Sequence, residues 1–311
     1  MSVKFSPGDT IDNTYIVEEA FDEGGFGHAY KVKNGSGYEV LKICKESTGT
    51  IEAQRFEQEN DFLHRLSPHE RIIEPLSRTA TLSISHLYYR MKLADYNLAR
   101  YLENFEDGLN LKQKVDIFRA VCEGLKHAHE NHILHRDLHW GNILVDVLND
   151  CPLPKLTDFG RSKDLQALAV LSTSPGVWGE FVCPPEIRFK IWDTLPQNYT
   201  EGDIYALGIV FCYLIRAQPD YPSIFKNDIA NFTRGKKIDL VSITDETVRQ
   251  SLYQEWLSAM KPERLNYLSL LINEGAEINQ QINATIKKLS HPDFRLRCHS
   301  IDEVLGEVSK Y

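Results

Sequence analysis

At 311 residues the chain is too long for one minimal hydrophobic core and suits two lobes, so we expect one functional unit built from two sub-domains. Hydrophobic residues form 42% and charged residues 25% of the sequence, a globular balance that excludes a disordered or fibrous chain. The formal charge of −9, from 35 basic and 44 acidic side chains, argues against general nucleic-acid binding.

The hydropathy pattern and the cysteines predict a location. No stretch approaches the ~18 to 20 consecutive apolar residues that cross a bilayer, and residues 1–13 lack the apolar core of a secretion signal. The six cysteines are scattered without a C-x-x-C pair, which favours reduced thiols over disulfides or zinc. We therefore expect a cytoplasmic protein with no membrane partner.

The segment 15–91 shows short extended patterns and one helix. The runs YIVEEAF and HAYKVKNGSGYEVLKI predict three strands, the last two joined by a glycine-containing turn. The run IEAQRFEQENDFLHRL (51–66) carries apolar residues at helical spacing, and HLYYRMKL (86–93) returns to a strand pattern. These elements predict a small sheet with one helix packed on it.

After Asp95 the helical period takes over. The run at 111–132 has apolar residues on one face, and the run DIYALGIVFCYLIR (203–216) is apolar almost all round, which predicts a central buried helix. Two short polar segments, ILHRDLHWGNILV and KLTDFG, interrupt the helices. We expect an N-terminal extension over 1–14, an N-lobe over 15–93 and a C-lobe over 94–311.

The first motifs of interest lie in the N-lobe. EGGFGHAY (23–30) is glycine-rich where a backbone lies over phosphates without a Cβ in the way, although a flexible hairpin turn explains it equally well alone. Lys42 ends the strand-like run YEVLK, and Glu59 follows seventeen residues later on the inner face of the helix. A lysine that binds α- and β-phosphates needs such a carboxylate to hold it.

The second group of motifs is HRDLHWGN (135–142) and DFG. Asp137 and Asn142 lie five residues apart, which places a carboxylate near an attacking hydroxyl and an amide oxygen near a metal. Asp158 begins DFG 21 residues after Asp137 and supplies a second hard oxygen ligand of the kind that magnesium prefers.

These motifs, with a PPE sequence after them, resemble the eukaryotic-type protein kinase family in order and spacing over Tyr15 to about Leu305. The resemblance implies an α+β, bilobal protein-kinase-like fold, with a small antiparallel β-sheet lobe carrying one helix and a larger, mainly α-helical lobe. It implies a Ser/Thr kinase that uses ATP and Mg²⁺ or Mn²⁺ to phosphorylate protein substrates, including itself.

The resemblance also implies residue roles. Lys42, Glu59 and the base Asp137 would be catalytic, and Asn142 and Asp158 would bind metal. Leu63, His135 and Phe159 would stack between the lobes above Asp203, and Glu186 would pair with Arg297. The nucleotide would contact Phe21, Gly24, Gly25, Gly27, Ala29, Val40, Lys42, Met91, Lys92, Leu93, Ala94 and Leu144.

Two positions depart from the family pattern. Asp22 replaces the first loop glycine, and an aspartate near phosphates is repulsive. His139 stands where Ser/Thr kinases usually carry a lysine, and its ordinary pKa near 6.5 would leave it fully cationic only at lower pH. We hypothesise that His139 assists the transferred phosphoryl group.

HRDLHWGN is also similar to the catalytic loop of haspin-type kinases, and HxDLHxGN recurs in small-molecule phosphotransferases of the kinase-like fold. A small-molecule hydroxyl is therefore the alternative substrate. DFG, the CPPE segment and the helix at 203–216 count against both. A non-catalytic scaffold is least favoured, because Lys42, Asp137, Asn142 and Asp158 are all present.

The loop between DFG and PPE contains three candidate phosphosites, Ser172, Thr173 and Ser174. Arg136 precedes the catalytic Asp137, and an arginine there commonly receives a phosphate from that loop. We therefore predict autophosphorylation. Regulation by a separate partner is a further expectation.

Overall fold

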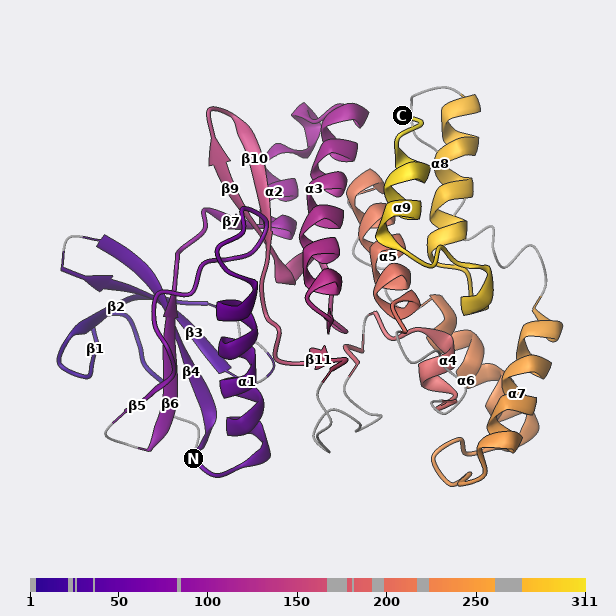
Figure 1. The fold of residues 1–311 in the computed structure, drawn as a ribbon, viewed down its shortest axis with the longest axis horizontal. Helices are drawn as coiled ribbons and strands as arrows, with labels where there is room; N and C mark the ends of the chain where they lie inside the picture. Colours follow the sequence, from indigo (N-terminus) through magenta and orange to yellow (C-terminus); the bar gives the residue numbers. More distant parts are fainter. Residues whose placement is uncertain are drawn as a thin grey trace.

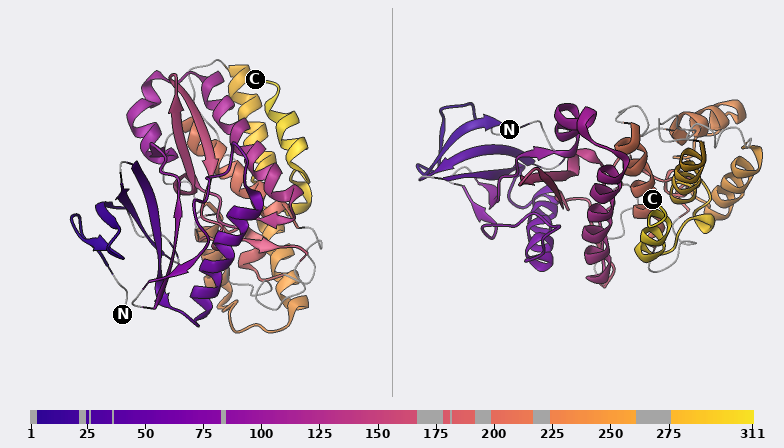
Figure 2. Two further views of the ribbon diagram at one scale, coloured as in Figure 1. Left: turned by 60° about the vertical axis from the view of Figure 1, so that its left-hand side comes forward. Right: turned by 90° about the horizontal axis from the view of Figure 1, so that it is seen from above.

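The computed structural model describes residues 4–21, 25, 27–35, 37–82, 85–166, 178–180, 182–191, 199–216, 224–260 and 276–311. Within these ranges, an antiparallel sheet with one helix lies on one side of the molecule and a larger group of helices on the other (Figure 1). Two further views keep the sheet and the helices on separate sides (Figure 2). The predicted α+β, two-lobed fold is confirmed, while the boundary at residues 93 and 94 remains a prediction.

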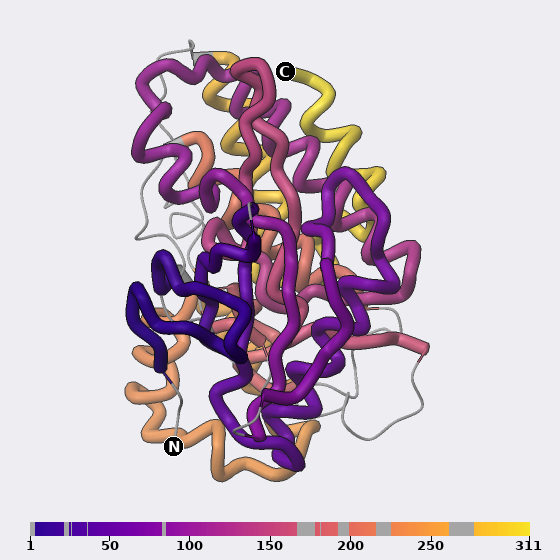
Figure 3. The backbone as a smooth tube through the Cα atoms, turned by 90° about the vertical axis from the view of Figure 1, so that its left-hand side faces the viewer, coloured from indigo at the N-terminus to yellow at the C-terminus, as the bar shows by residue number. Residues whose placement is uncertain are grey.

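The N-terminal sheet has the strand order β1-β2-β3-β4-β6-β5, and every neighbouring pair is antiparallel. Its strands are β1 (Thr10–Ile11), β2 (Tyr15–Ala20), β3 (Gly27–Asn34), β4 (Gly37–Ser47), β5 (Ala80–Thr81) and β6 (His86–Met91). Figure 3, viewed from the side of this sheet, shows the strands in front of the C-terminal helices. Gly35, with a φ of +61°, provides the left-handed residue in the tight β3–β4 turn.

Helix α1 (Ile51–Leu66) packs on β4 and β6. Its N-cap is Thr50, whose hydroxyl accepts a hydrogen bond from the Ala53 N–H, and its apolar face buries Phe56 and Leu63. Side chains alternate along a strand, so Val40, Lys42 and the buried Cys44 of β4 all face α1. The sheet therefore aims Lys42 at the helix that carries Glu59.

Between the sheet and the C-terminal helices lie two small sheets, β10-β9-β7 and β11-β8. The elements of this region are β7 (Tyr96–Asn97), α2 (Leu98–Phe105), η1 (Glu106–Gly108), α3 (Leu111–Glu130), β8 (Ile133–Leu134), η2 (Trp140–Asn142), β9 (Ile143–Leu148), β10 (Cys151–Leu156) and β11 (Lys163–Asp164). A capping box of Asn110 and Gln113 begins α3. The polar segments predicted between the helices are the loops on either side of η2, β9 and β10.

The remaining elements are α4 (Pro185–Arg188), α5 (Glu201–Arg216), α6 (Ile224–Lys236), α7 (Glu246–Ala259), α8 (Ala276–Leu289), η7 (Phe294–Leu296) and α9 (Ile301–Val308). Helix α5 contacts both α3 and α8, and its described side chains are buried, as its all-round apolar sequence predicts. One large core joins α1, α3, α5, α8 and α9 to the inner face of the sheet. The six cysteines are free thiols, and no helix of the described ranges is long and apolar enough to span a bilayer.

Candidate functional site

Lys42 lies at the centre of a buried polar cluster. Its Nζ is 2.6 Å from Oε1 of Glu59 on α1 and 3.5 Å from Oδ1 of Asp158. Tyr89, opposite Lys42 in the β4–β6 register, donates its hydroxyl to the same Glu59 oxygen at 2.9 Å. The cluster thus links the sheet, the helix and the DFG segment through one ammonium group.

The charges of this cluster are strongly coupled. Burial raises the pKa of Glu59 to about 6, although Lys42 opposes the shift. Burial favours the neutral form of Lys42, but the attraction of Asp158 and Glu59 outweighs it and raises the pKa above its usual range. Burial raises the pKa of Asp158, but the attraction of Lys42 outweighs burial, so the pKa falls below its usual value. At neutral pH all three groups are therefore predominantly charged.

Helix α5 holds the HRD segment through Asp203. This fully buried carboxylate accepts hydrogen bonds from the backbone N–H groups of His135 and Arg136, each at 2.8 Å. The His135 ring lies 4.7 Å from the Phe159 ring, as the predicted stack requires, and its Nε2 is 3.0 Å from the Thr157 carbonyl. These contacts fix the HRD and DFG segments against one another.

Both segments contain a strained residue. Arg136 has a φ of +63° and Asp158 a φ of +59°, the left-handed region that non-glycine residues rarely adopt. Such conformations persist only where surrounding contacts determine them, and they concentrate at functional sites. Here they turn the chain so that the side chains of Asp137 and Asp158 belong to one electrostatic cluster.

The Asp137 carboxyl group has a strongly raised pKa. Burial and then repulsion from Asp158 raise its pKa to about 7, while Arg161 and Asn142 act in the opposite direction. Its Oδ2 is 3.2 Å from Nε of Arg161. Gly179 also lies against it, because a Cβ added there would overlap the carboxylate. A pKa near neutral is the value that suits a group that takes up a proton during a reaction.

His139 is neutral in this environment. Its Nδ1 accepts a hydrogen bond from the Gly141 N–H at 3.0 Å, and its Nε2 is 3.9 Å from Oδ1 of Asp137. Burial lowers its pKa to about 4, well below the ordinary value near 6.5. The acceptor role of Nδ1 assigns the proton to Nε2, which therefore points a neutral N–H donor toward Asp137.

Asn142 and Asp158 carry side-chain oxygens of the kind that can bind a metal ion. The Asn142 side-chain amide donates to the Asp137 carbonyl at 2.8 Å, and its backbone carbonyl accepts from the Thr157 N–H at 3.1 Å, which ties it to the segment of Asp158. Among the described residues no group of three His, Cys, Asp or Glu could hold a metal by itself. Two oxygen-bearing side chains suit Mg²⁺, which completes its shell with phosphates and water.

Several of the predicted nucleotide contacts are half-buried apolar side chains. Phe21, Ala29, Leu93 and Leu144 come from different strands and loops and pack against the main core while remaining partly exposed. Val40 and Met91 are buried and face each other in the β4–β6 register. The structure thus places two of the six predicted nucleotide contacts, Val40 and Met91, opposite each other on neighbouring strands.

The segment after Met91 offers free backbone groups. The Lys92 N–H donates to the Glu74 carbonyl at 2.9 Å. Within the described residues, Leu93 and Ala94 make no backbone hydrogen bond. Unpaired N–H and C=O groups beside apolar side chains are the features that recognise a planar base.

Of the predicted phosphate loop, Gly25 is exposed, and a Cβ added at Gly27 would press on the Ile43 carbonyl at 3.0 Å and on Phe56 at 3.1 Å. A larger residue at position 27, where β3 pairs with β4, would therefore have to displace these neighbours by a few tenths of an ångström. Asp22, Gly24 and the three candidate phosphosites, Ser172, Thr173 and Ser174, lie outside the described residues.

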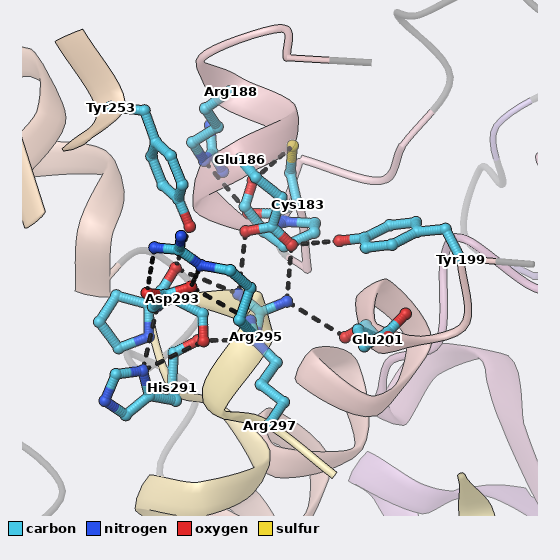
Figure 4. A network of polar contacts seen from close by, with 12 residues as sticks. Cys183, Glu186, Arg188, Tyr199, Glu201, Tyr253, His291, Asp293, Arg295 and Arg297 are labelled. Carbon is cyan, nitrogen blue, oxygen red and sulfur yellow. Dashed lines mark hydrogen bonds and ion pairs between the residues drawn. The ribbon is translucent and has the colours of Figure 1, made fainter. Parts of the chain in front are cut away.

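A second buried ion pair lies further along the chain (Figure 4). Arg297 donates to both carboxylate oxygens of Glu186, at 2.6 and 2.9 Å, and neither side chain is exposed. Tyr199 donates its hydroxyl to Glu186, and the Glu201 carbonyl accepts from Arg297 at 3.1 Å. The predicted pair is confirmed, and it ties the PPE segment to α5 and to the chain after α8.

Three residues near the site were not predicted from the sequence. Tyr89 could have been predicted, because the alternation of β6 puts it on the face of Lys42. Arg161 directly follows DFG. This cation could have been singled out, because the HRDLHWGN loop lacks the usual lysine. For Gly179 the sequence offers no such signal, since its proximity to Asp137 is set by tertiary folding.

Comparisons with known proteins agree with this geometry. The family model described as a protein kinase domain matches residues 15–307. MAP3K epsilon protein kinase 2 of Arabidopsis thaliana is 26% identical over 224 residues, which are 71% of this chain and 16% of that protein. Serine/threonine-protein kinase PLK4 of Aedes aegypti is 30% identical over 226 residues, 68% of this chain and 27% of its own length.

The phosphorylase b kinase gamma catalytic chain, liver/testis isoform, of Mus musculus is 25% identical over 270 residues, which are 83% of this chain and 60% of that protein. The matched region therefore spans less than two thirds of each of these three relatives.

Proposed function

Because the chain belongs to the protein kinase domain family, we propose that it transfers the γ-phosphoryl group of Mg-ATP to Ser or Thr hydroxyls of proteins. The observation that supports this most is the convergence of Lys42, Asp158 and Asp137 in one buried cluster. A cation for phosphates, a metal ligand and a near-neutral carboxylate are the groups that phosphoryl transfer uses.

In this mechanism Glu59 holds the Lys42 ammonium toward the α- and β-phosphates. Asp158 and Asn142 would hold Mg²⁺, which when bound neutralises charge on the nucleotide phosphates. Asp137 accepts the hydrogen bond of the acceptor hydroxyl and takes its proton, and the neutral Nε2–H of His139 donates a hydrogen bond beside it. Catalysis is then mainly positioning and charge neutralisation.

The nucleotide base would lie against the half-buried side chains of Phe21, Ala29 and Leu144. The unpaired backbone groups of Leu93 and Ala94 would hydrogen-bond its edge. Gly25 and Gly27, with Gly24, would cover the phosphates.

The Ser/Thr assignment is supported by the name of the mosquito relative, a serine/threonine-protein kinase. Phosphoamino-acid analysis of a labelled substrate tests it directly. Label on Ser or Thr is expected, and label on tyrosine alone would contradict it.

The decisive experiment compares wild type with Asp137→Ala in the presence of radiolabelled ATP, Mg²⁺ and a generic basic protein. We expect transfer to polypeptide by the wild type and a loss of about 10²- to 10⁴-fold in the variant. Asp61→Ala is the matched control, because Asp61 is an exposed aspartate on α1. ATP consumption without labelled polypeptide would point to the small-molecule alternative, and a fully active Asp137→Ala would refute the mechanism.

We further propose autophosphorylation at Ser172, Thr173 or Ser174. A basic cluster of Arg55, Arg136 and Lys163 supports it: burial lowers the pKa of Arg136 to about 10, where Asp203 opposes the shift and Arg55 adds to it. Burial and then repulsion from Arg136 likewise lower the pKa of Lys163. A phosphate between like charges would relieve this repulsion.

Mass spectrometry of wild type and Asp137→Ala after incubation with Mg-ATP tests this proposal. Phosphate within residues 172–174 of the wild type alone is expected. An active sample without phosphate at residues 172–174 would contradict the proposed autophosphorylation. We also propose protein substrates, a cytoplasmic location and a separate regulatory partner. The similarity of HRDLHWGN to haspin-type loops likewise stays a proposal.

A further inference from the structure

Within the described residues, the acidic centre of the site has two cationic side chains beside it. Lys42 serves Glu59 and Asp158, and Arg161 lies with Nε 3.2 Å from Oδ2 of Asp137. The Nε2 of His139 lies 3.9 Å from the other oxygen of Asp137. In the described part of the chain, Arg161 is thus the permanently charged side chain that is paired with Asp137.

We propose that Arg161 is a catalytic residue of phosphoryl transfer, whose guanidinium holds the Asp137 carboxylate by one edge and binds the transferred phosphoryl group by another. This inference rests on the proposed function above. It assigns to a residue of the DFG turn the role for which Ser/Thr kinases usually carry a lysine at the position of His139.

The backbone around Arg161 is held firmly enough for this role. The Ser162 N–H donates to the Phe159 carbonyl at 3.0 Å, which closes a tight turn with Arg161 as its third residue. The Ser162 hydroxyl donates to the His135 carbonyl at 3.2 Å, and Phe159 and Ser162 are both buried. The turn is therefore anchored to the HRD segment, and Arg161 projects from a fixed point between Asp158 and Asp137.

The chemistry of the side chain suits two partners at once. A guanidinium carries five N–H donors in a planar fork and stays charged at any physiological pH, so a single carboxylate does not exhaust it. During phosphoryl transfer, negative charge spreads over three equatorial oxygens next to the attacking hydroxyl. The Arg161 side chain is 30% exposed and Asp137 14%, so the arginine lies on the open side of the pair.

The same contact has an alternative role, in which the ion pair to Arg161 blocks the base Asp137. The two roles predict opposite signs. If Arg161 stabilises the transition state, its removal lowers kcat. If the pair is an inhibitory lock, its removal raises kcat.

The test measures kcat and KM for ATP in wild type, Arg161→Ala, Arg161→Gln and Arg161→Lys. We expect Arg161→Ala and Arg161→Gln to lose about 10²- to 10³-fold in kcat, as for one lost charge-stabilising donor. KM for ATP should change far less, because Lys42 and the metal ligands remain. Arg161→Lys should recover part of the loss, and added guanidinium should partly rescue Arg161→Ala.

Arg78→Ala is the matched control, since Arg78 forms an exposed ion pair with Asp61 in the N-lobe. Thermal melting accompanies each variant, and Arg161→Gln keeps the test valid if Arg161→Ala folds poorly. Wild-type kcat or a raised kcat in the folded variants overturns the inference. An inactive wild type would instead refute the proposed function, so the two failures are distinguishable.

Discussion

Two acid–base clusters in the described part of this chain differ in how far solvent reaches them. Glu186 and Arg297 meet in a two-point contact with no exposed surface, and the remaining donors of Arg297 reach the carbonyls of His291, Glu201 and Pro292 (Figure 4). Asp137 and Arg161, in contrast, are both partly exposed. The first cluster is closed to solvent, while the second is open to it.

The same contrast appears in the pKa values. Burial would lower the pKa of Arg297, but Glu186 outweighs it and the arginine is held in its charged form. Asp137 has a pKa raised to about 7, because burial and Asp158 outweigh Arg161. A closed pair stabilises one arrangement of the chain, whereas a partly exposed carboxylate can exchange a proton. Exposure to solvent, together with a pKa near neutral, distinguishes the candidate reactive cluster from the structural one.

The largest expected effect is on the closed cluster. Arg297→Ala leaves Glu186 charged and buried without its partner, so we expect the free energy of unfolding to fall by about 3–5 kcal/mol. Urea denaturation measures it. Arg295→Ala is the matched control, because the Arg295–Asp293 pair lies two residues away with Arg295 55% exposed, and such pairs contribute about 0–1 kcal/mol. Equal losses in both variants would contradict the distinction drawn here.

The open cluster should respond in activity instead. Gly179→Ala would push a methyl group into the Asp137 carboxylate, and a displacement of about 1 Å at a reacting group lowers kcat by about 10²-fold. Steady-state kinetics with melting curves separate this from unfolding. Gly306→Ala serves as control: the position is exposed on α9 with open space around it, so the change should stabilise the helix by about 0.5–1 kcal/mol and leave kcat unchanged. Wild-type kcat in Gly179→Ala would contradict the expected effect of this contact on catalysis.

The regular elements explain how much could be predicted from the sequence. The strand of Lys42 and the helix of Glu59 each have a clear period, so the side on which each residue faces follows from counting. The buried α5 and the pairing of Glu186 with Arg297 were equally accessible, because an all-apolar helix and a family motif mark them. The fold class and the family therefore followed from pattern and spacing.

What could not be predicted depends on turns and on burial. The direction of Arg161 is set by hydrogen bonds of Ser162 to Phe159 and His135, which no periodicity reveals. The neutral state of His139 depends on how deeply the folded chain buries it, and the sequence supplied only its ordinary pKa. These two residues decide where the positive charge of the site lies, and that question required the structure.

The pH dependence of activity should be the smallest of the three effects and the most specific to the open cluster. Asp137 accepts a proton only when it is ionised, and its pKa of about 7 means that the active form is lost as pH falls. We therefore expect kcat/KM, which reports the free enzyme, to rise from pH 6 to a plateau above pH 8, with about a tenfold deficit one unit below the pKa.

Protonation of Glu59, with a pKa of about 6, should steepen the decline at the acid end because it releases Lys42. The residual activity of Asp137→Asn provides the comparison, since it retains the ionisations of ATP, Glu59 and the substrate but has no carboxyl group at position 137. Its profile should lack the step near pH 7. A wild-type profile that is flat between pH 6 and 8, or one that Asp137→Asn reproduces, would show that the open carboxylate does not take up the proton, and the contrast between the two clusters would then be one of packing alone.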